Sequence, residues 1–369
     1  MQTQGKMTFG RLEAVFLLIN LICTKLFLFF PRMTVEDAGT AGWIMVVFST
    51  LIMLIMFSIM IRLFKPFEGK DILDVAAIAG GKPLRFITGV LLASIAFFTV
   101  VISLREFSED MKVISLPASP ISFVILFFII GMALGSFFGL EAIIRINAFV
   151  VPVIAVGYIL ILAGVIPNMD SDNLFPILGT GLKDIFGMGL LRVSVFFELL
   201  TIFIITPFLR DSKKIRSSSY IAFGLSSLIL TIGSLAYILV FPYPSNKELF
   251  LPTYHMARLI SIGRFFQRIE SLFVFIWAMS ALLYMTATFY LMLYIVAKTA
   301  GLKYLRPLIL PFAVIVFSAA FIPQSLISVI NITTGIVYKI NGVAAFVFYT
   351  LIFIIANLRQ KSKKGVCKN

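Results

Sequence analysis

Two ionisable side chains inside long apolar stretches are the residues best placed for chemistry. Glu198 lies near the middle of the stretch Arg192 to Leu209, and Lys25 lies in the stretch near residues 12–31. If these stretches cross a membrane, each charge costs several kcal/mol unless it is paired or hydrated, and such residues commonly serve ligands or protons. We therefore expect Glu198 and Lys25 to flank a central site in which Glu198 binds an ammonium group or carries a proton.

Two plainer interpretations of this pair stay open. Glu198 and Lys25 could form an ion pair with a purely structural role. Alternatively, Lys25, which lies toward the outer end of its stretch, could extend its long aliphatic stem to the membrane surface. A ligand response that survives the change Glu198→Gln would contradict a functional role for the carboxylate.

Small polar residues accompany both charges. Thr201 follows Glu198 by three positions and so lies about one helical turn away on a neighbouring face. When Pro31 and Pro207, which close the two stretches, are aligned, the polar part of the first stretch falls opposite residues 196–201 of the second. We expect this polar part to contribute to the same site through Asn20, Thr24 and Lys25.

A further apolar stretch carries hydroxyl groups at helical spacing. Ser280, Tyr284 and Thr288 are four residues apart, which places them on one face of a helix. This face could line a cavity, or its hydroxyl groups could make ordinary hydrogen bonds between helices. The spacing is compatible with both.

Catalytic and metal-binding motifs are absent from the sequence. The chain has one histidine and two cysteines, and it has no phosphate-binding glycine loop, no zinc-binding histidine pair and no Gly-x-Ser-x-Gly motif. We therefore expect no enzymatic activity, no metal and no cofactor.

The composition shows what kind of chain positions these residues. Of 369 residues, 60% are hydrophobic and 13% are charged, whereas a soluble protein ordinarily has about 25% charged residues. A soluble enzyme is therefore excluded, and at about 20 residues per crossing the apolar residues suffice for on the order of ten helices. The hydropathy predicts an all-α polytopic membrane protein with ten transmembrane helices, near residues 12–31, 41–63, 84–104, 120–138, 142–166, 188–209, 219–241, 270–297, 307–323 and 338–357.

The basic residues orient these helices. An even number of spans puts both termini on one side, and with that side cytoplasmic the inner segments hold 20 Lys and Arg residues and the outer segments 9. Lys and Arg accumulate in cytoplasmic loops, so both termini, including a basic tail at 358–369, are predicted to be cytoplasmic. The same bias accounts for most of the net charge of +14 without nucleic acid as a partner.

Ten spans suggest a five-plus-five inverted repeat within a single transmembrane permease domain over residues 1–369. Repeat one would cover about 12–166 and repeat two about 188–357. Both begin with a stretch that ends in a proline and a nearby arginine, one facing outward and the other inward, as inversion requires.

The long segment between the seventh and eighth spans, Phe241 to Arg268, holds four of the nine outer basic residues. Within it, Tyr254 to Phe266 has apolar residues spaced like a short amphipathic helix at the membrane interface. The segment is either a solvated connector or an outer lid or docking surface.

Three sequence strings resemble those of spore germination permeases. The first is Pro31-Arg-Met-Thr-Val-Glu-Asp-Ala-Gly-Thr-Ala-Gly-Trp43, between spans one and two. The second is Arg264-Phe-Phe-Gln-Arg-Ile-Glu270-Ser-Leu-Phe-Val-Phe-Ile-Trp277, at the entry to span eight, and the third is Phe196-Phe-Glu198. With ten spans and matching loop lengths, the likeness covers nearly the whole chain. The family it resembles is the GerAB-type B subunit of nutrient germinant receptors, within the amino acid/polyamine/organocation superfamily.

This resemblance implies a LeuT-like (amino acid permease) fold in the inner membrane of a bacterial endospore, next to receptor A and C subunits. It places Glu198 and the polar segment Asn20 to Lys25 in a ligand pocket, and Arg268, Glu270 and Trp277 at an outer gate. Unlike related transporters, the chain has no glycine between Glu13 and Pro31. Span one must therefore break without glycine or remain continuous, which would favour sensing over transport.

The function expected from these observations is a germinant receptor subunit that binds a small nutrient, an L-amino acid, in a central pocket and signals spore germination. One alternative is a proton-coupled amino acid transporter in which Glu198 titrates. A second is a structural membrane subunit with a vestigial pocket that holds its partners.

Overall fold

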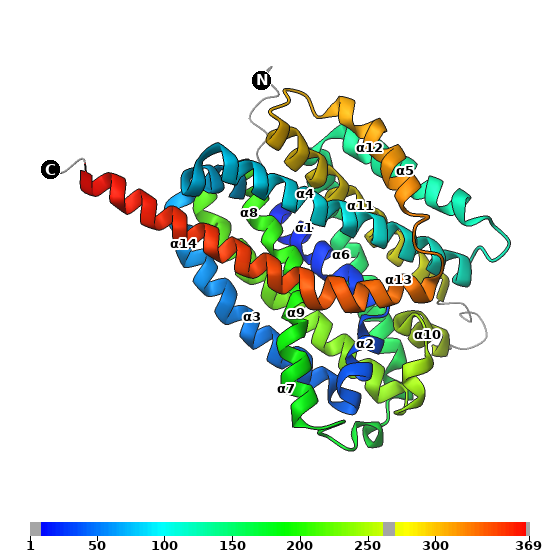
Figure 1. Ribbon diagram of the computed structural model, residues 1–369. Helices are drawn as coiled ribbons and strands as arrows, with labels where there is room; N and C mark the ends of the chain where they lie inside the picture. The colour runs from blue at the N-terminus through cyan, green and yellow to red at the C-terminus, as the bar shows by residue number, and fades with distance from the viewer. Residues whose placement is uncertain (1–8, 261–269, 367–369) are drawn as a thin grey trace.

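The computed structural model describes residues 9–260 and 270–366, and within these ranges the chain is almost entirely helical, with a single backbone bridge between Phe9 and Leu209 in place of any strand (Figure 1). The α-helices are α1 (Arg11–Cys23), α2 (Phe30–Ala38), α3 (Gly42–Phe64), α4 (Ile72–Ile114), α5 (Ile121–Phe138), α6 (Leu140–Val165), α7 (Leu182–Leu191), α8 (Ile202–Ile205), α9 (Ile215–Val240), α10 (Pro252–Leu259), α11 (Glu270–Ala300), α12 (Arg306–Ala319), α13 (Leu326–Ile332) and α14 (Gly342–Val366). Short 3₁₀ segments and one π-helical segment, Thr333–Asn341, join several of them.

Eight helical segments among the described residues are long and apolar enough to cross a membrane. They correspond to eight of the ten predicted spans. The first predicted span is divided between α1 and α2, and the ninth corresponds to α12, which has 14 residues. The multi-pass helical architecture is thus confirmed, while the count of ten crossings stays a prediction.

Two of the apolar segments are interrupted helices. α1 gives way to a 3₁₀ turn at Thr24–Phe27, and α2 starts at Phe30 with Pro31 in its first turn. Proline has no N–H with which to continue a preceding helix and is favoured in the first turn of a new one, so Pro31 suits the start of α2. The first span is therefore broken without a glycine.

The second interruption lies in the sixth predicted span. Between α7 and α8, residues Arg192–Thr201 form a ten-residue 3₁₀ segment. A 3₁₀ stretch of this length is uncommon and often marks a functional hinge or strain. Both predicted site charges, Lys25 and Glu198, lie in these irregular segments.

The interrupted helices pack in the middle of the molecule. α1 packs against α6 and α9, while α11 packs against α4, α5 and α6. α14 runs across the visible face and packs against α4 (Figure 1). Glycines let α5 approach α11 closely, because a Cβ at Gly131 or Gly135 would lie 2.7 Å from Leu282 or 2.6 Å from Thr286. The glycine spacing of this span thus serves helix packing.

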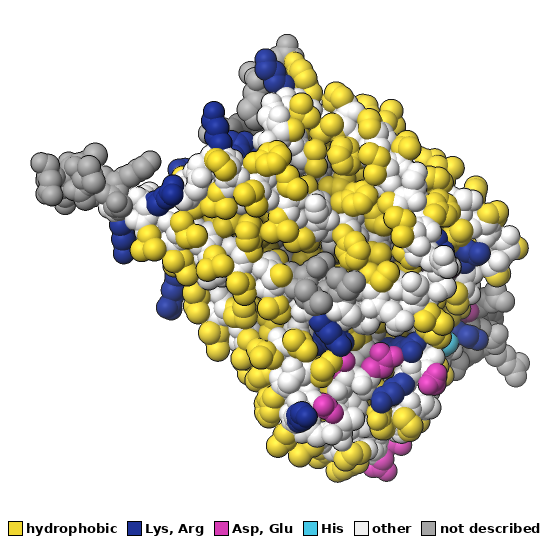
Figure 2. Space-filling model, viewed as in Figure 1, with side chains coloured by type: hydrophobic (Ala, Val, Ile, Leu, Met, Phe, Trp, Pro, Cys, Tyr) yellow, Lys and Arg dark blue, Asp and Glu magenta, His cyan; other side chains and the backbone are white. Residues whose placement is uncertain are grey.

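The surface fits a protein that faces lipid. Hydrophobic side chains cover most of the visible face, while charged side chains gather at its ends, with acidic residues visible only toward the end that holds α2 and α7 (Figure 2). The chain segments next to the two termini are each hydrogen-bonded to a distant part of the chain. The backbone N–H of Phe9 donates to the carbonyl of Phe208, and the side-chain amide of Asn357 donates to the carbonyl of Leu63.

Candidate functional site

A buried ion pair joins the two interrupted helices. Lys25 Nζ lies 2.7 Å from Glu198 Oε2, and the two side chains are 3% and 5% exposed. The Lys25 ammonium group also donates to the carbonyl of Val195 and lies 5.2 Å from the centroid of the Tyr338 ring. Lys25 therefore does not extend to the membrane surface, and of the alternatives considered for it the direct ion pair is the one observed.

A backbone carbonyl helps to accommodate this pair. Two buried charges are tolerated when good geometry and additional hydrogen bonds offset their lost hydration. The carbonyl of Val195, in the 3₁₀ segment, accepts a hydrogen bond from Lys25, so the ammonium group has a second acceptor besides Glu198.

The polar residues of span one contact α11. Thr24 Oγ1 lies 2.9 Å from Ser280 Oγ, which in turn lies 2.8 Å from Asn20 Oδ1. Asn20 Nδ2 donates to the carbonyl of Ser280 at 3.3 Å, and Thr24 Oγ1 lies 2.6 Å from the carbonyl of Asn20. Asn20 and Ser280 thus make hydrogen bonds between helices, and their network includes Thr24.

Two cavities adjoin the ion pair. The first has a volume of about 20 Å³, room for about one water molecule, and the second has a volume of about 80 Å³. Both are lined by Thr99, Phe197, Glu198 and Tyr284, so these four residues lie between them. Of the other predicted site residues, Thr24 and Lys25 line the first cavity, and Thr201 and Thr288 line the second.

Glu106 is a cavity residue that the sequence reasoning missed. It lies on α4, is 1% exposed and lines the first cavity together with Lys25 and Glu198. The hydropathy pattern ended the third span near residue 104 because the following segment is rich in charges, but α4 continues to Ile114. A sign of its burial was present in the sequence, since Arg105 and Glu106 follow the apolar stretch without any turn-forming residue in between.

The π-helical segment supplies another wall of the first cavity. Its residues Thr333, Val337 and Tyr338 line the cavity, and Thr333 Oγ1 lies 3.2 Å from Glu106 Oε2. Single π-helical turns are rare and occur frequently at functional sites. This segment also contacts the interrupted sixth span through Ser194, whose hydroxyl group donates to the carbonyl of Lys339 and accepts from the N–H of Val343.

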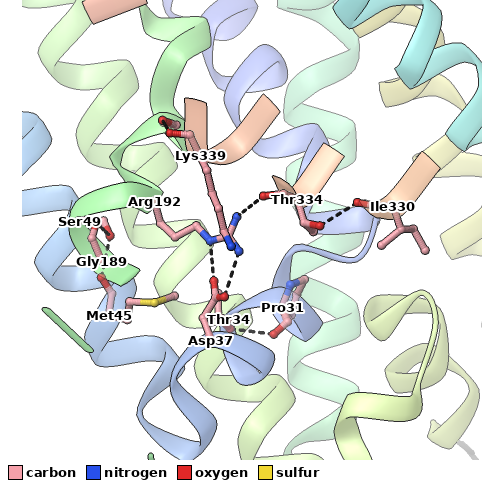
Figure 3. Close-up of polar contacts among 11 residues, drawn as sticks. Pro31, Thr34, Asp37, Met45, Ser49, Gly189, Arg192, Ile330, Thr334 and Lys339 are labelled. Carbon is pink, nitrogen blue, oxygen red and sulfur yellow. Dashed lines mark hydrogen bonds and ion pairs between the residues drawn. The ribbon is translucent and has the colours of Figure 1, made fainter. Parts of the chain in front are cut away.

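A second buried ion pair joins α2 to the interrupted sixth span (Figure 3). The Arg192 guanidinium group contacts both carboxylate oxygens of Asp37, with Nε–Oδ2 at 2.5 Å and Nη2–Oδ1 at 3.0 Å, and it also donates to the carbonyl of Thr334 at 2.7 Å. The side chains of Arg192 and Asp37 are 4% and 8% exposed. One side chain thus fastens α2, the interrupted sixth span and the π-helical segment to one another. Both basic residues that the sequence places inside spans are therefore paired.

The predicted outer-gate residues are only partly described. Arg268 lies outside the described residues, and Glu270 begins α11, where it is half-buried. Trp277 is fully buried and stacks on Phe273 at an interplanar angle of 8°, and its ring centroid is 5.5 Å from that of Phe107, a residue of the first cavity. In the preceding segment, the amphipathic helix expected over 254–266 is observed as α10, Pro252–Leu259, while residues 261–269 lie outside the described ranges.

Among residues 9–260 and 270–366, no group of three or more His, Cys, Asp and Glu side chains is placed to hold a metal ion. The cavity presents one ammonium group, two carboxylates and several hydroxyl groups. Such an arrangement can bind a small polar ligand that carries charges of both signs.

Comparison with protein families gives one match that covers most of the chain. The profile of a family described as "Spore germination protein" matches residues 10–329. Spore germination protein B2 of Bacillus subtilis (strain 168) is 21% identical over 281 residues, 75% of each chain. Spore germination protein A2 of the same organism is 25% identical over 285 residues, 75% of this chain and 76% of the relative.

Solved structures establish the fold. Mhp1, a nucleobase-cation-symport-1 family transporter in a closed conformation with bromovinylhydantoin bound, superposes with a TM-score of 0.66 at 13% identity, over 96% of this chain and 91% of its own. A Na⁺-coupled sialic acid symporter in a substrate-bound outward-open state also gives 0.66, at 10% identity, over 95% and 80%. The chain therefore has the LeuT-like fold of these membrane transporters.

Proposed function

The chain belongs to the spore germination protein family, and from that premise we propose that it is a germinant receptor subunit that binds a small germinant, an L-amino acid, and signals spore germination. The ligand would occupy the central cavity beside Lys25 and Glu198. The protein would lie in the inner membrane of the spore, with both termini cytoplasmic, in a complex with receptor A and C subunits.

The observation that carries this proposal is the Lys25–Glu198 pair, which is buried at the meeting point of two interrupted helices and lines a cavity. A free amino acid carries one charge of each sign, so it complements a cavity in which an ammonium group and carboxylates lie together. Because a charge inside a membrane protein is costly, a ligand that complements these charges gains specificity against uncharged competitors.

Signalling by this site requires two states of different affinity. The first cavity has room for about one water molecule, so an amino acid requires it to widen. A ligand that fits only a more open state would shift the equilibrium toward that state. The movement would pass through the two interrupted helices, and it accords with a permease domain built from repeats at about 12–166 and 188–357.

The experiment is a screen of the common amino acids, sugars and nucleosides for thermal stabilisation of the purified protein, because a ligand bound only by the folded state raises the unfolding midpoint. We expect one or a few amino acids to stabilise wild type and to lose this effect with Glu198→Gln. Equal stabilisation of both proteins would contradict a role for Glu198. Absence of any stabilising ligand would favour the scaffold alternative.

A proton-coupled transporter is the second candidate function, and the fold shared with two symporters favours it. The discriminating measurement is uptake of labelled amino acids by vesicles that contain the protein. Accumulation that depends on a proton gradient and is lost with Glu198→Gln would establish transport. Binding without uptake would establish sensing alone.

A further inference from the structure

The first cavity contains a carboxylate that has no cationic partner. Glu106 Oε1 has no hydrogen-bond partner among the described residues. Its other oxygen, Oε2, contacts only the hydroxyl group of Thr333, which also lies 3.0 Å from the carbonyl of Val329. Since a hydroxyl group has a single hydrogen, the Val329 carbonyl competes with Glu106 for it.

The ion pair in the same cavity does not neutralise this carboxylate. Glu198 is already paired with Lys25, so the charged lining residues Lys25, Glu198 and Glu106 together carry one negative charge in excess when all are ionised. A carboxylate buried to this extent needs a cation or strong hydrogen-bond donors. The neighbouring lining residues Thr24, Thr99 and Tyr284 offer hydroxyl groups only.

Lys25 still has binding capacity toward a ligand. Its ammonium group has three N–H donors, of which one points to the carbonyl of Val195 and one to Glu198. The third N–H can donate a hydrogen bond to an anionic group of the ligand while the Lys25–Glu198 pair stays intact. The cavity therefore presents a donor on Lys25 and an acceptor on Glu106.

We infer that Glu106 is the residue of this site that binds the protonated amino group of the ligand. The ligand carboxylate would take the third donor of Lys25, and its ammonium group would contact Glu106 Oε1. Glu198 then acts by holding Lys25 in position. The inference rests on the proposed function, because it states how the proposed germinant lies in the cavity.

The test uses methylammonium chloride, the smallest organic ion with this group, so the germinant need not be known. The unfolding midpoint is measured for the purified full chain at constant ionic strength while methylammonium replaces choline, whose quaternary ammonium group has no N–H to donate to Glu106. We expect methylammonium to raise the midpoint of wild type, and Glu106→Gln to raise the half-maximal concentration about ten- to a hundredfold, the range for a hydrogen bond to a charged group. Glu141→Gln, an exposed partner of Arg145 on α6, is the matched control and should leave the concentration unchanged.

Three results would overturn the inference. The first is an absence of stabilisation of wild type, a measurement that does not depend on whether Glu106→Gln folds. The second is stabilisation that Glu106→Gln retains, and the third is stabilisation by sodium chloride but not by methylammonium, which would identify an alkali cation as the occupant. If a germinant stabilises the protein and methylammonium does not, this inference fails and the proposed function stands. If methylammonium acts through Glu106 and no germinant binds, the inference stands and the proposed function fails.

Discussion

Lys25 and Glu198 are 173 positions apart in the chain, and their side chains meet at 2.7 Å. Each belongs to a helix that is interrupted at that point. If the two interrupted helices separate at this point, the pair must break, and if the pair is kept, the two helices must move together. In the proposed function, this one contact therefore couples ligand binding to the relative position of the two interrupted helices.

The first prediction concerns the energy of this pair. Lys25→Met or Glu198→Gln alone leaves an unpaired buried polar or charged group and should lower the free energy of unfolding by about 3–5 kcal/mol. The double variant should be less destabilised than either single variant, because no unpaired charge remains. Thermal unfolding of the four proteins measures the coupling, and additive losses would contradict it. The exposed pair Arg145–Glu141 is the control, where we expect about 0–1 kcal/mol.

The second prediction concerns the Arg192–Asp37 pair. Asp37→Asn leaves the buried guanidinium group without its anion, so we expect a lower unfolding midpoint and faster hydrogen exchange in α2 and in Thr333–Asn341, the elements that Arg192 joins. Hydrogen–deuterium exchange with mass spectrometry measures this locally. Glu36, which is exposed at the adjacent position and pairs with the half-buried Arg32, provides the control, and Glu36→Gln should change neither quantity. Unchanged exchange in Asp37→Asn would show that the pair does not fasten these elements.

The third prediction concerns the contact between α14 and the interrupted sixth span. A Cβ at Gly342 would lie 2.4 Å from the Cα of Ser194, and a backbone atom cannot easily move away. Gly342→Ala should therefore destabilise the protein by about 1–3 kcal/mol. Gly335→Ala is the matched control, because nothing lies within 4 Å of its Cβ position. Similar unfolding midpoints for the two variants would contradict close packing at Gly342.

The fourth prediction concerns the only histidine of the chain, His255 on α10. Burial among neighbouring groups, with a contribution from the positive charge of Arg258, lowers the pKa of His255 below its usual 6.5. Folded His255 thus binds its proton more weakly than unfolded His255, so its contribution to stability falls as the pH drops below about 6.5. NMR of histidine-labelled protein gives a single titration curve.

We expect the midpoint of that curve to lie below 6.5 and to rise in Arg258→Gln, since one of the two causes is removed. The denatured protein provides the reference near 6.5. If the titration midpoint of native His255 lay at or above that of the denatured protein, the proposed effect of its burial would be contradicted.

The sequence determined the class of the protein through local properties. Hydropathy is nearly additive along the chain, so apolar stretches predicted the helices, and eight of the ten predicted spans are recovered as membrane-length segments. The rarity of charges within those stretches also identified Lys25 and Glu198 as candidate site residues, and their ion pair was one of the alternatives. The partner of Arg192 could not be predicted in the same way, because Asp37 lies in a loop-like sequence and is 155 positions from Arg192.

The tertiary structure decided which residues form the site. Glu106 appeared to lie beyond the third span, and only the continuation of α4 to Ile114 brings it into the cavity with Lys25. Ser280 and Asn20 appeared equally suited to bind a ligand, and their mutual hydrogen bonds show that they bind each other. Which buried polar groups are satisfied depends on side chains contributed by several distant helices. Local sequence therefore fixes that a charge is buried, and only the packed structure decides whether it remains free for a ligand.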